Sequence, residues 1–289
     1  MGAHDGLVWR VPLARVDATP FDHRLTLMHP GLASIVVALA TWETWLWYGR
    51  RIAEAPEDVL ALMMLVLALA VTPALRLNST GMVKRLDGSM LAGLAILLVG
   101  YAASRGVLPP ILRAAMALAG TIACTYVALY GRSPPVGVWG AAALALPVLP
   151  SLQFVLGYPM RIVSAALTVL VLQMQGLAVE RQGTLLLWQG ELIQFDAPCS
   201  GVRMLWAGVL LTLIGCVALG INGRRTLLAV GASLVVILAA NVLRATSLFV
   251  IEARLVPQPP AWWHEGTGVV AFACAATVML SLLLRLRAS

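Results

Sequence analysis

The sequence predicts an all-α polytopic integral membrane protein, and two features lead to this fold class. Of its 289 residues, 60% are hydrophobic and 11% are charged, whereas about 25% of the residues of a soluble globular domain are charged. Apolar runs of about 20 residues, the length that crosses a bilayer as a helix, recur along the chain. A transmembrane β-barrel would instead show short stretches of alternating hydrophobicity.

We expect about eight transmembrane helices, one for each clear apolar run. A further apolar segment, 136–158, carries Pro147 and Pro150, which disfavour a straight helix, so we expect it to be broken or interfacial. Residues 1–30 are polar and show no apolar signal-peptide core. They predict a cytoplasmic N-terminal tail ahead of a single transmembrane domain, 31–289. The expected spans are 31–49, 58–75, 89–104, 110–130, 159–179, 202–221, 226–250 and 266–284.

The distribution of basic residues predicts the orientation in the cell (inner) membrane. Segments rich in Lys and Arg tend to stay in the cytoplasm, and arginines such as Arg10 and Arg285 place both ends of the chain inside. Two cytoplasmic ends require an even number of spans, which excludes 136–158 as a ninth. The segments 180–200 and 251–265 then both face the extracytoplasmic side.

Neither nucleic acid nor a metal is an expected ligand. The net charge is +7, but no basic patch interleaved with aromatic residues is present. Cys124, Cys216 and Cys274 lie within apolar runs, where a thiol ordinarily acts as a small apolar side chain. No CxxC or Cys/His ligand spacing occurs, so we predict no metal and no other cofactor. Only Cys199 lies among polar residues at the boundary of a run.

The two outward segments have recognisable local patterns. Two short apolar runs flank Gln189-Gly190 and predict a short extracytoplasmic hairpin near 184–195. The segment 251–265 contains three prolines and two tryptophans, which favour the interface, and it ends in His264 and Glu265. We expect both segments to pack together over the outer ends of the neighbouring spans.

Cys199 directly precedes the expected span 202–221, in the sequence DAPCSGVRML. A helix N-terminus favours the thiolate form of a cysteine. Arg203, four residues later, would lie on the same helical face and favour the thiolate too. The alternative is an incidental cysteine beside an arginine that extends to the interface, and the motif by itself supports both interpretations equally.

Arg244 favours the functional interpretation because it lies inside the apolar run 226–250. Its position is about 9 Å below the outer end of that run, and an embedded arginine costs about 2.5–3.5 kcal/mol on insertion scales. Asn241 lies three residues earlier on the same face and could bind the same partner. Extension of Arg244 to the surface remains the alternative.

His264 is the one histidine that the predicted topology places on the same side of the membrane as Cys199. A loop histidine is usually a solvated side chain, but the other three lie in or beside the cytoplasmic tail. A thiolate, an imidazole and a guanidinium together suit acyl transfer. They would supply the nucleophile, the proton for the leaving group and the stabilisation of the oxyanion.

These motifs resemble the exosortase/archaeosortase family of membrane-embedded cysteine transpeptidases. The resemblance covers about 150–285 and includes GYPMRIVSAALTVLVLQMQGLAVERQGTLL, CSGVR, NVLRA and the late histidine. It implies that Cys199 is the nucleophile and that Arg244 and His264 are the essential arginine and histidine. The supporting candidates are Arg203 and Asn241, which match the family motifs, with Asp196 and Glu265, which lie near Cys199 and His264.

The resemblance also implies substrates and partners. Such enzymes cleave a C-terminal sorting signal, made of a short motif, a transmembrane helix and a basic tail, through a thioester on the extracytoplasmic side. The exported protein then passes to an unknown acceptor, for example a lipid or glycan carrier. One alternative is a non-enzymatic transporter, or an export or assembly factor for envelope polysaccharide, in which Arg244 binds an anion and Cys199 is dispensable. Another is a membrane protease that hydrolyses the thioester without transfer.

Overall fold

The computed structural model describes residues 29–55, 57–74, 86, 88–194, 200–256, 260 and 262–288. Within these residues the chain forms ten helices and a three-stranded sheet. The helices are α1 (Pro30–Ala40), α2 (Trp42–Glu54), α3 (Glu57–Ala74), α4 (Gly88–Ala103), α5 (Pro110–Tyr130), α6 (Val136–Ala145), α7 (Leu149–Met174), α8 (Val202–Leu219), α9 (Arg224–Glu252) and α10 (Trp263–Ala288). The strands are β1 (Glu180–Gln182), β2 (Leu185–Trp188) and β3 (Glu191–Gln194).

Five helices in the described part of the chain are long and apolar enough to cross a membrane. They are α5, α7, α8, α9 and the part of α10 from Glu265 to Ala288. Three shorter apolar helices, which correspond to α1, α4 and α6, accompany them. The chain is therefore an all-α multi-pass membrane protein, while the count of eight spans stays a prediction.

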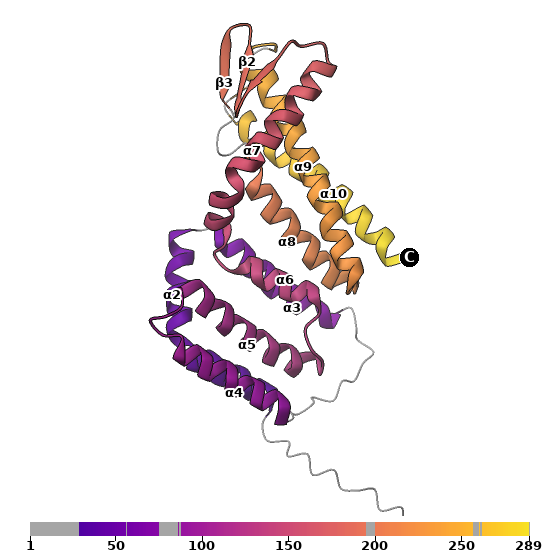
Figure 1. The fold of residues 1–289 in the computed structure, drawn as a ribbon. Coiled ribbons are helices and arrows are strands. Elements are labelled where there is room, and N and C mark those ends of the chain that lie inside the picture. Colours follow the sequence, from indigo (N-terminus) through magenta and orange to yellow (C-terminus); the bar gives the residue numbers. More distant parts are fainter. Residues whose placement is uncertain are drawn as a thin grey trace, which may run out of the picture.

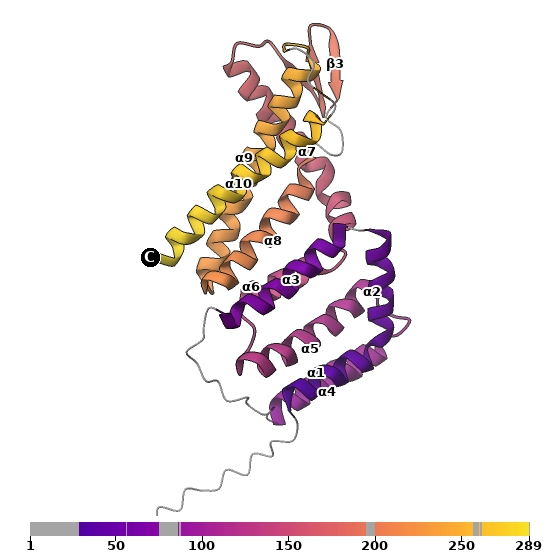
Figure 2. The same ribbon diagram turned by 180° about the vertical axis from the view of Figure 1, so that it is seen from behind.

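The apolar run 31–49 does not form the single helix that the sequence predicts. It is divided at Thr41, whose backbone leaves the helical region with φ −110° and ψ 23°. Figures 1 and 2 show the following helix, α2, running across the ends of its neighbours rather than beside them. Its three tryptophans, together with Arg50 and Arg51, are typical of a helix that lies in the membrane interface.

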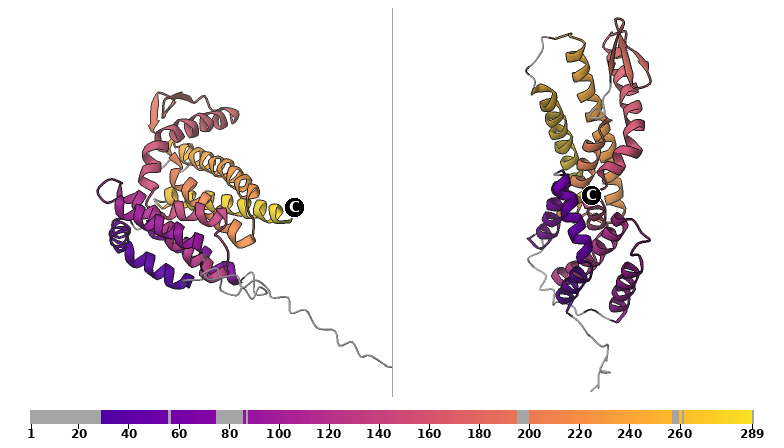
Figure 3. Two further views of the ribbon diagram at one scale, coloured as in Figure 1. Left: turned by 60° about the horizontal axis from the view of Figure 1, so that its bottom comes forward. Right: turned by 90° about the vertical axis from the view of Figure 1, so that its left-hand side faces the viewer.

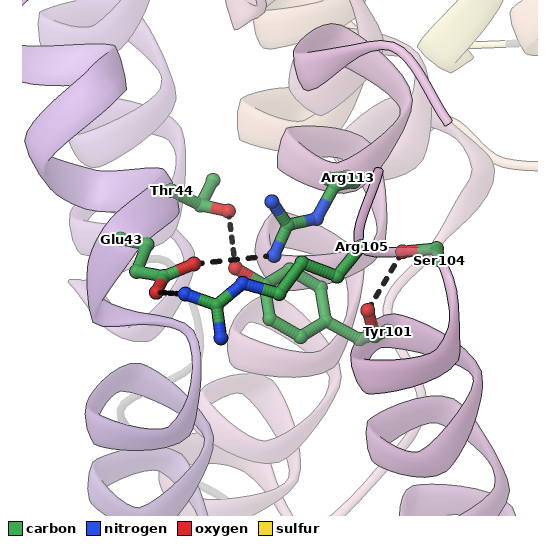
Figure 4. Close-up of polar contacts among 6 residues, drawn as sticks. All are labelled: Glu43, Thr44, Tyr101, Ser104, Arg105 and Arg113. Carbon is green, nitrogen blue, oxygen red and sulfur yellow. Dashed lines mark hydrogen bonds and ion pairs between the residues drawn. The ribbon is translucent and has the colours of Figure 1, made fainter. Parts of the chain in front are cut away.

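Glu43 links α2 to the connection between α4 and α5, as Figure 4 shows. Its carboxylate pairs with Arg105 and, at 3.5 Å, with Arg113. The guanidinium carbon of Arg113 lies 4.6 Å from the ring centroid of Tyr101. The hydroxyl oxygen of Tyr101 lies 2.6 Å from that of Thr44 on α2. This polar cluster fixes one end of the N-terminal helices.

The segment 136–158 is broken, as predicted, but the break is confined to the residues around Pro147 between α6 and α7. Pro150 falls in the first turn of α7, where a proline removes no helical hydrogen bond. The helix then continues through Pro159. The predicted span 159–179 is therefore wrong at its start, because the same helix begins ten residues earlier, at Leu149.

The predicted hairpin is present, and a third strand extends it to the order β1-β2-β3. Trp188 pairs with Glu191, so the loop consists of Gln189 and Gly190. Both loop residues have positive φ, 52° and 86°, as a type I′ turn requires. One face of the sheet packs against α7 and α9. The buried cluster there contains Ala165, Val169, Leu172, Val179, Leu186, Ala245 and Phe249.

Helix α8 occupies the interior of the bundle. Of the 18 residues of α8, 56% are buried, whereas 17% are buried in the most apolar 18-residue stretch of α10. Glycines allow its neighbours to approach closely. A Cβ atom on Gly208 would overlap Ile237 of α9, and one on Gly215 would lie 2.6 Å from Cδ1 of Leu283 on α10.

The helices form two groups on either side of α6 and α8. Figure 3 shows α1, α2, α4 and α5 in one half of the molecule and α7, α9 and α10 in the other. Figures 1 and 2 show the ends of α7 and α9 extending past the first turns of α8 and α10. The sheet lies beside this extended part. The sheet and the ends of α7 and α9 therefore both lie beyond the starts of α8 and α10.

Candidate functional site

The start of α8, one turn of α9 and the start of α10 carry the described candidate residues. Cys199 and Asp196 lie outside the described residues, and so does the side chain of His264. The geometry described below is therefore that of the neighbouring residues on α7, α8, α9 and α10.

The residues that follow Cys199 form a tight turn into α8. Gly201 caps the helix with φ 75° and ψ 4°, in the left-handed region that glycine adopts at little cost. Ser200 is buried, and its hydroxyl accepts a hydrogen bond of 3.4 Å from the backbone N–H of Val202. Ser200 and Gly201 thus form a turn of defined conformation that leads into α8.

Asn241 of α9 lies directly against this turn. A Cβ atom on Gly201 would be 2.6 Å from Cγ of Asn241. Residue 201 must therefore be glycine for two reasons, its positive φ and the space that Asn241 occupies. Asn241 is 1% exposed, and its Nδ2 donates to the hydroxyl of Ser164 on α7 at 3.0 Å. Three helices, α7, α8 and α9, therefore meet at the turn that leads into α8.

Arg244 lies one turn further along α9, on the same side as Asn241, and contacts α10. A Cβ atom on Gly268 would lie 3.1 Å from Nε and 3.4 Å from Cζ of Arg244. Nε itself is buried. Because α9 continues for eight residues to Glu252, Arg244 lies about 12 Å below the end of the helix, deeper than the 9 Å that the sequence suggests.

The start of α10 completes the described surroundings. The helix begins at Trp263, so the backbone of His264 and Glu265 lies in its first turn. Glu265 is exposed, and a carboxylate at this position interacts favourably with the helix dipole. His264 precedes Gly268 by four residues, about 6 Å along the axis. Its backbone is therefore one turn from the contact with Arg244.

The N-terminal cap of α8 thus meets α9 at Asn241, and the second turn of α10 meets it at Arg244. Each helix start carries partial positive charge, and Arg244 adds a full one. A thiolate or a developing oxyanion at this point would be stabilised by both. Within the described ranges, no three His, Cys, Asp or Glu side chains are grouped as a metal site would require.

Arg203 has a different environment from the rest of the site. It is exposed in the first turn of α8, whereas Gly201 and Asn241 beneath it are buried. Its position is that of a group at the surface of the site.

The sequence-based candidates did not include the polar residues of α7. Ser164 is fully buried against Asn241. Thr168, one turn later, is also fully buried, and its hydroxyl has no hydrogen-bond partner in the part of the chain that the structure describes. The available signal was the spacing: two small hydroxyl residues four apart in an apolar helix lie on one face.

Comparison with known proteins points to the same region of the chain. The family model described as "Transmembrane exosortase" matches residues 63–281, which are 219 of the 289 residues. The match includes the starts of α8 and α10 and the whole of α9. No curated protein and no solved structure matches the chain.

Proposed function

This chain belongs to the transmembrane exosortase family, and on that basis we propose that it is a membrane-embedded cysteine transpeptidase. It cleaves the C-terminal sorting signal of exported proteins at the extracytoplasmic face of the cell (inner) membrane. The observation that carries the proposal is that the cap of α8 and the second turn of α10 meet one turn of α9, at Asn241 and Arg244.

In the proposed reaction, the thiolate of Cys199 attacks the carbonyl carbon of the scissile peptide bond. The C–N bond breaks, the leaving amine takes a proton from His264, and a thioester joins the exported protein to the enzyme. An acceptor nucleophile then attacks the thioester, loses its proton to His264 and releases the thiolate. Arg244 donates hydrogen bonds to the oxyanion in both steps.

The remaining candidates have supporting roles in this proposal. Asn241 holds the turn at Gly201 and thereby fixes the segment that carries the nucleophile. Arg203, at the surface of the site, binds polar groups of the sorting signal. Asp196 and Glu265 provide polar surroundings for the nucleophile and the histidine. The acceptor is a nucleophile at the outer membrane surface, for example on a lipid or glycan carrier.

Replacement of the nucleophile tests the proposal. A membrane-anchored reporter that ends in a sorting signal encoded in the source genome is expressed with the full-length enzyme, and loss of its tail is followed by mass. Cys199→Ser should abolish processing, while Cys274→Ser, which changes an exposed thiol of α10, should leave it intact. Normal processing with Cys199→Ser would contradict a cysteine transpeptidase, and no processing by the wild-type enzyme would favour a non-enzymatic role, such as transport or envelope polysaccharide export.

The product of the reporter separates transfer from hydrolysis. A transpeptidase should release a reporter whose new C-terminus carries the mass of the acceptor. A plain protease should release a free carboxylate, because water then resolves the thioester.

A further inference from the structure

Strand β3 has a hydrogen-bonding edge that pairs with no other strand in the described part of the chain. In a two-residue hairpin, the residues that flank the loop form a hydrogen-bonded pair, and the pairs then alternate. Trp188 and Glu191 flank the loop, so Glu191 and Ile193 bond to β2. The backbone N–H and C=O groups of Leu192 and Gln194 therefore point to the outer edge of the sheet.

This strand leads to the catalytic region. Figures 1 and 2 both show the arrow of β3 pointing from the tip of the sheet toward the starts of α8 and α10. Gln194 precedes Cys199 by five residues, and five consecutive Cα–Cα steps reach at most about 19 Å. An extended peptide that follows the edge of β3 toward the helix starts would therefore approach the nucleophile.

The sheet is held firmly enough to act as a template. Leu186 is fully buried in the cluster with α7 and α9, and Trp188 and Ile193 pack against the same cluster. The ring of Trp188 meets that of Phe249 edge to face, with centroids 6.4 Å apart. Leu192, on the opposite face of the strand, is 56% exposed, so the outer edge and one face are accessible.

We propose that the segment of the substrate ahead of the scissile bond binds as a fourth strand on the outer edge of β3. The inference rests on the proposed function and specifies how the sorting signal is recognised. Backbone hydrogen bonds to Leu192 and Gln194 align the substrate, and its alternate side chains select the motif. An exported protein whose C-terminal helix enters the membrane runs toward the membrane from N- to C-terminus, as β3 does, so the added strand is parallel.

Proline substitution removes one N–H group from the edge and tests the strand addition. Leu192→Pro deletes an outward-pointing donor while the bonds to β2 are kept. It should lower kcat/KM for the reporter about tenfold, which corresponds to about one hydrogen bond. Leu192→Ala, which keeps the donor and shortens only the side chain, should lose much less activity than Leu192→Pro. Arg181→Pro makes the same change on the outer edge of β1 and should also have little effect.

Three results would overturn the proposal. They are normal processing by Leu192→Pro, an equal loss with Arg181→Pro, and an equal loss with Leu192→Ala, which would indicate the side chain rather than the edge. None of these depends on whether Cys199 is the nucleophile, since that is decided by Cys199→Ser. Failure of strand addition and failure of the proposed function are therefore distinguishable.

Cross-linking provides a measurement that does not require the proline variant to fold. Leu192→Cys and Gln194→Cys are each combined with Cys199→Ser, so that the substrate stays intact, and paired with single cysteines along the reporter. Position 194 should cross-link to reporter positions closer to the scissile bond than those of position 192. The reverse order would overturn the parallel arrangement, and no cross-link at any reporter position would overturn the strand addition.

Discussion

The side-chain amide of Asn241 is in contact with the backbone of Gly201, at the turn between the predicted nucleophile and α8. No side chain fits at residue 201, because a Cβ atom would lie 2.6 Å from Cγ of Asn241. A buried residue of α9 thus fixes the turn at Gly201, through which the chain enters α8. The first two predictions follow from this contact.

Gly201→Ala should abolish most processing. The left-handed conformation costs an alanine about 1–2 kcal/mol, and the methyl group must also displace Asn241. Gly106→Ala is the matched control, since Gly106 has φ 77° and open space around its Cα. Gly201→Ala should lose more conformational stability than Gly106→Ala in a thermal unfolding assay, because only it displaces Asn241, and only Gly201→Ala should lose activity. Equal activity of the two would show that the contact with Asn241 is unimportant.

The hydrogen bond between Asn241 and Ser164 should couple α7 to α9. A double-mutant cycle with Asn241→Ala and Ser164→Ala, measured by unfolding in detergent, should give an interaction free energy of about 0.5–1.5 kcal/mol. The sign should be stabilising for the wild-type pair. Strict additivity of the two substitutions would mean that the bond contributes nothing to the association of these helices.

Arg244→Lys should lower processing about a hundredfold or more while membrane insertion persists. The proposed bidentate hydrogen bonding to the oxyanion needs the planar pair of donors that lysine lacks, and one lost donor of this kind costs about 2.7–4 kcal/mol in the transition state. Turnover of the reporter and the amount of enzyme in the membrane are measured together. Near-normal turnover would mean that only the charge matters, and absence of the variant from the membrane would indicate a structural role.

Gly268→Ala should reduce activity without reducing stability. Alanine stabilises a helix interior by about 1 kcal/mol relative to glycine, but its Cβ would lie 3.1 Å from Nε of Arg244 and must shift the guanidinium. The control is Gly231→Ala in α9, where a Cβ atom meets nothing within 4 Å. Activity should fall severalfold only at residue 268. A fully active Gly268→Ala would argue against a requirement for the observed position of Arg244.

The polar cluster around Glu43 should affect stability and leave catalysis unchanged. Arg113→Ala removes a guanidinium that is 17% exposed and packs on Tyr101, whereas Arg105 is 71% exposed. Arg113→Ala should therefore destabilise the protein by on the order of 1 kcal/mol or more, and Arg105→Ala by less. Thermal unfolding and reporter processing of both variants check this. A larger effect of Arg105→Ala on unfolding would contradict the assignment.

The fold class could be predicted from the sequence because lipid allows few spanning structures. The ends of the helices could not be predicted in this way. Pro147 and Pro159 are both prolines within apolar runs, yet one separates two helices and the other lies inside a helix. Which of them breaks the chain depends on the packing of α6 and α7 with their neighbours. The division at Thr41 could not be predicted for the same reason, since the local pattern of 31–49 is continuous.

Only part of the geometry of the candidate site could be predicted from the sequence. Asn241 and Arg244 lie on one face of α9 because of their spacing in the sequence alone. The contact of Asn241 with Ser164 requires the arrangement of α7 beside α9, which periodicity does not contain. The exposure of Arg203 also depends on how α8 is rotated against its neighbours. Helix spacing predicts which residues share a face, but not which face is turned inward.

The interior position of α8 has a consequence for the order of biogenesis. Its glycine faces fit Ile237 and Leu283, and these residues are synthesised after α8 itself. During translation α8 is therefore packed only against earlier helices such as α3 and α6. Its two faces at Gly208 and Gly215 are still in contact with lipid or the insertion machinery. Only when α10 has entered the bilayer can these surfaces close, so chains truncated before α10 should be degraded rather than retained as inactive enzyme.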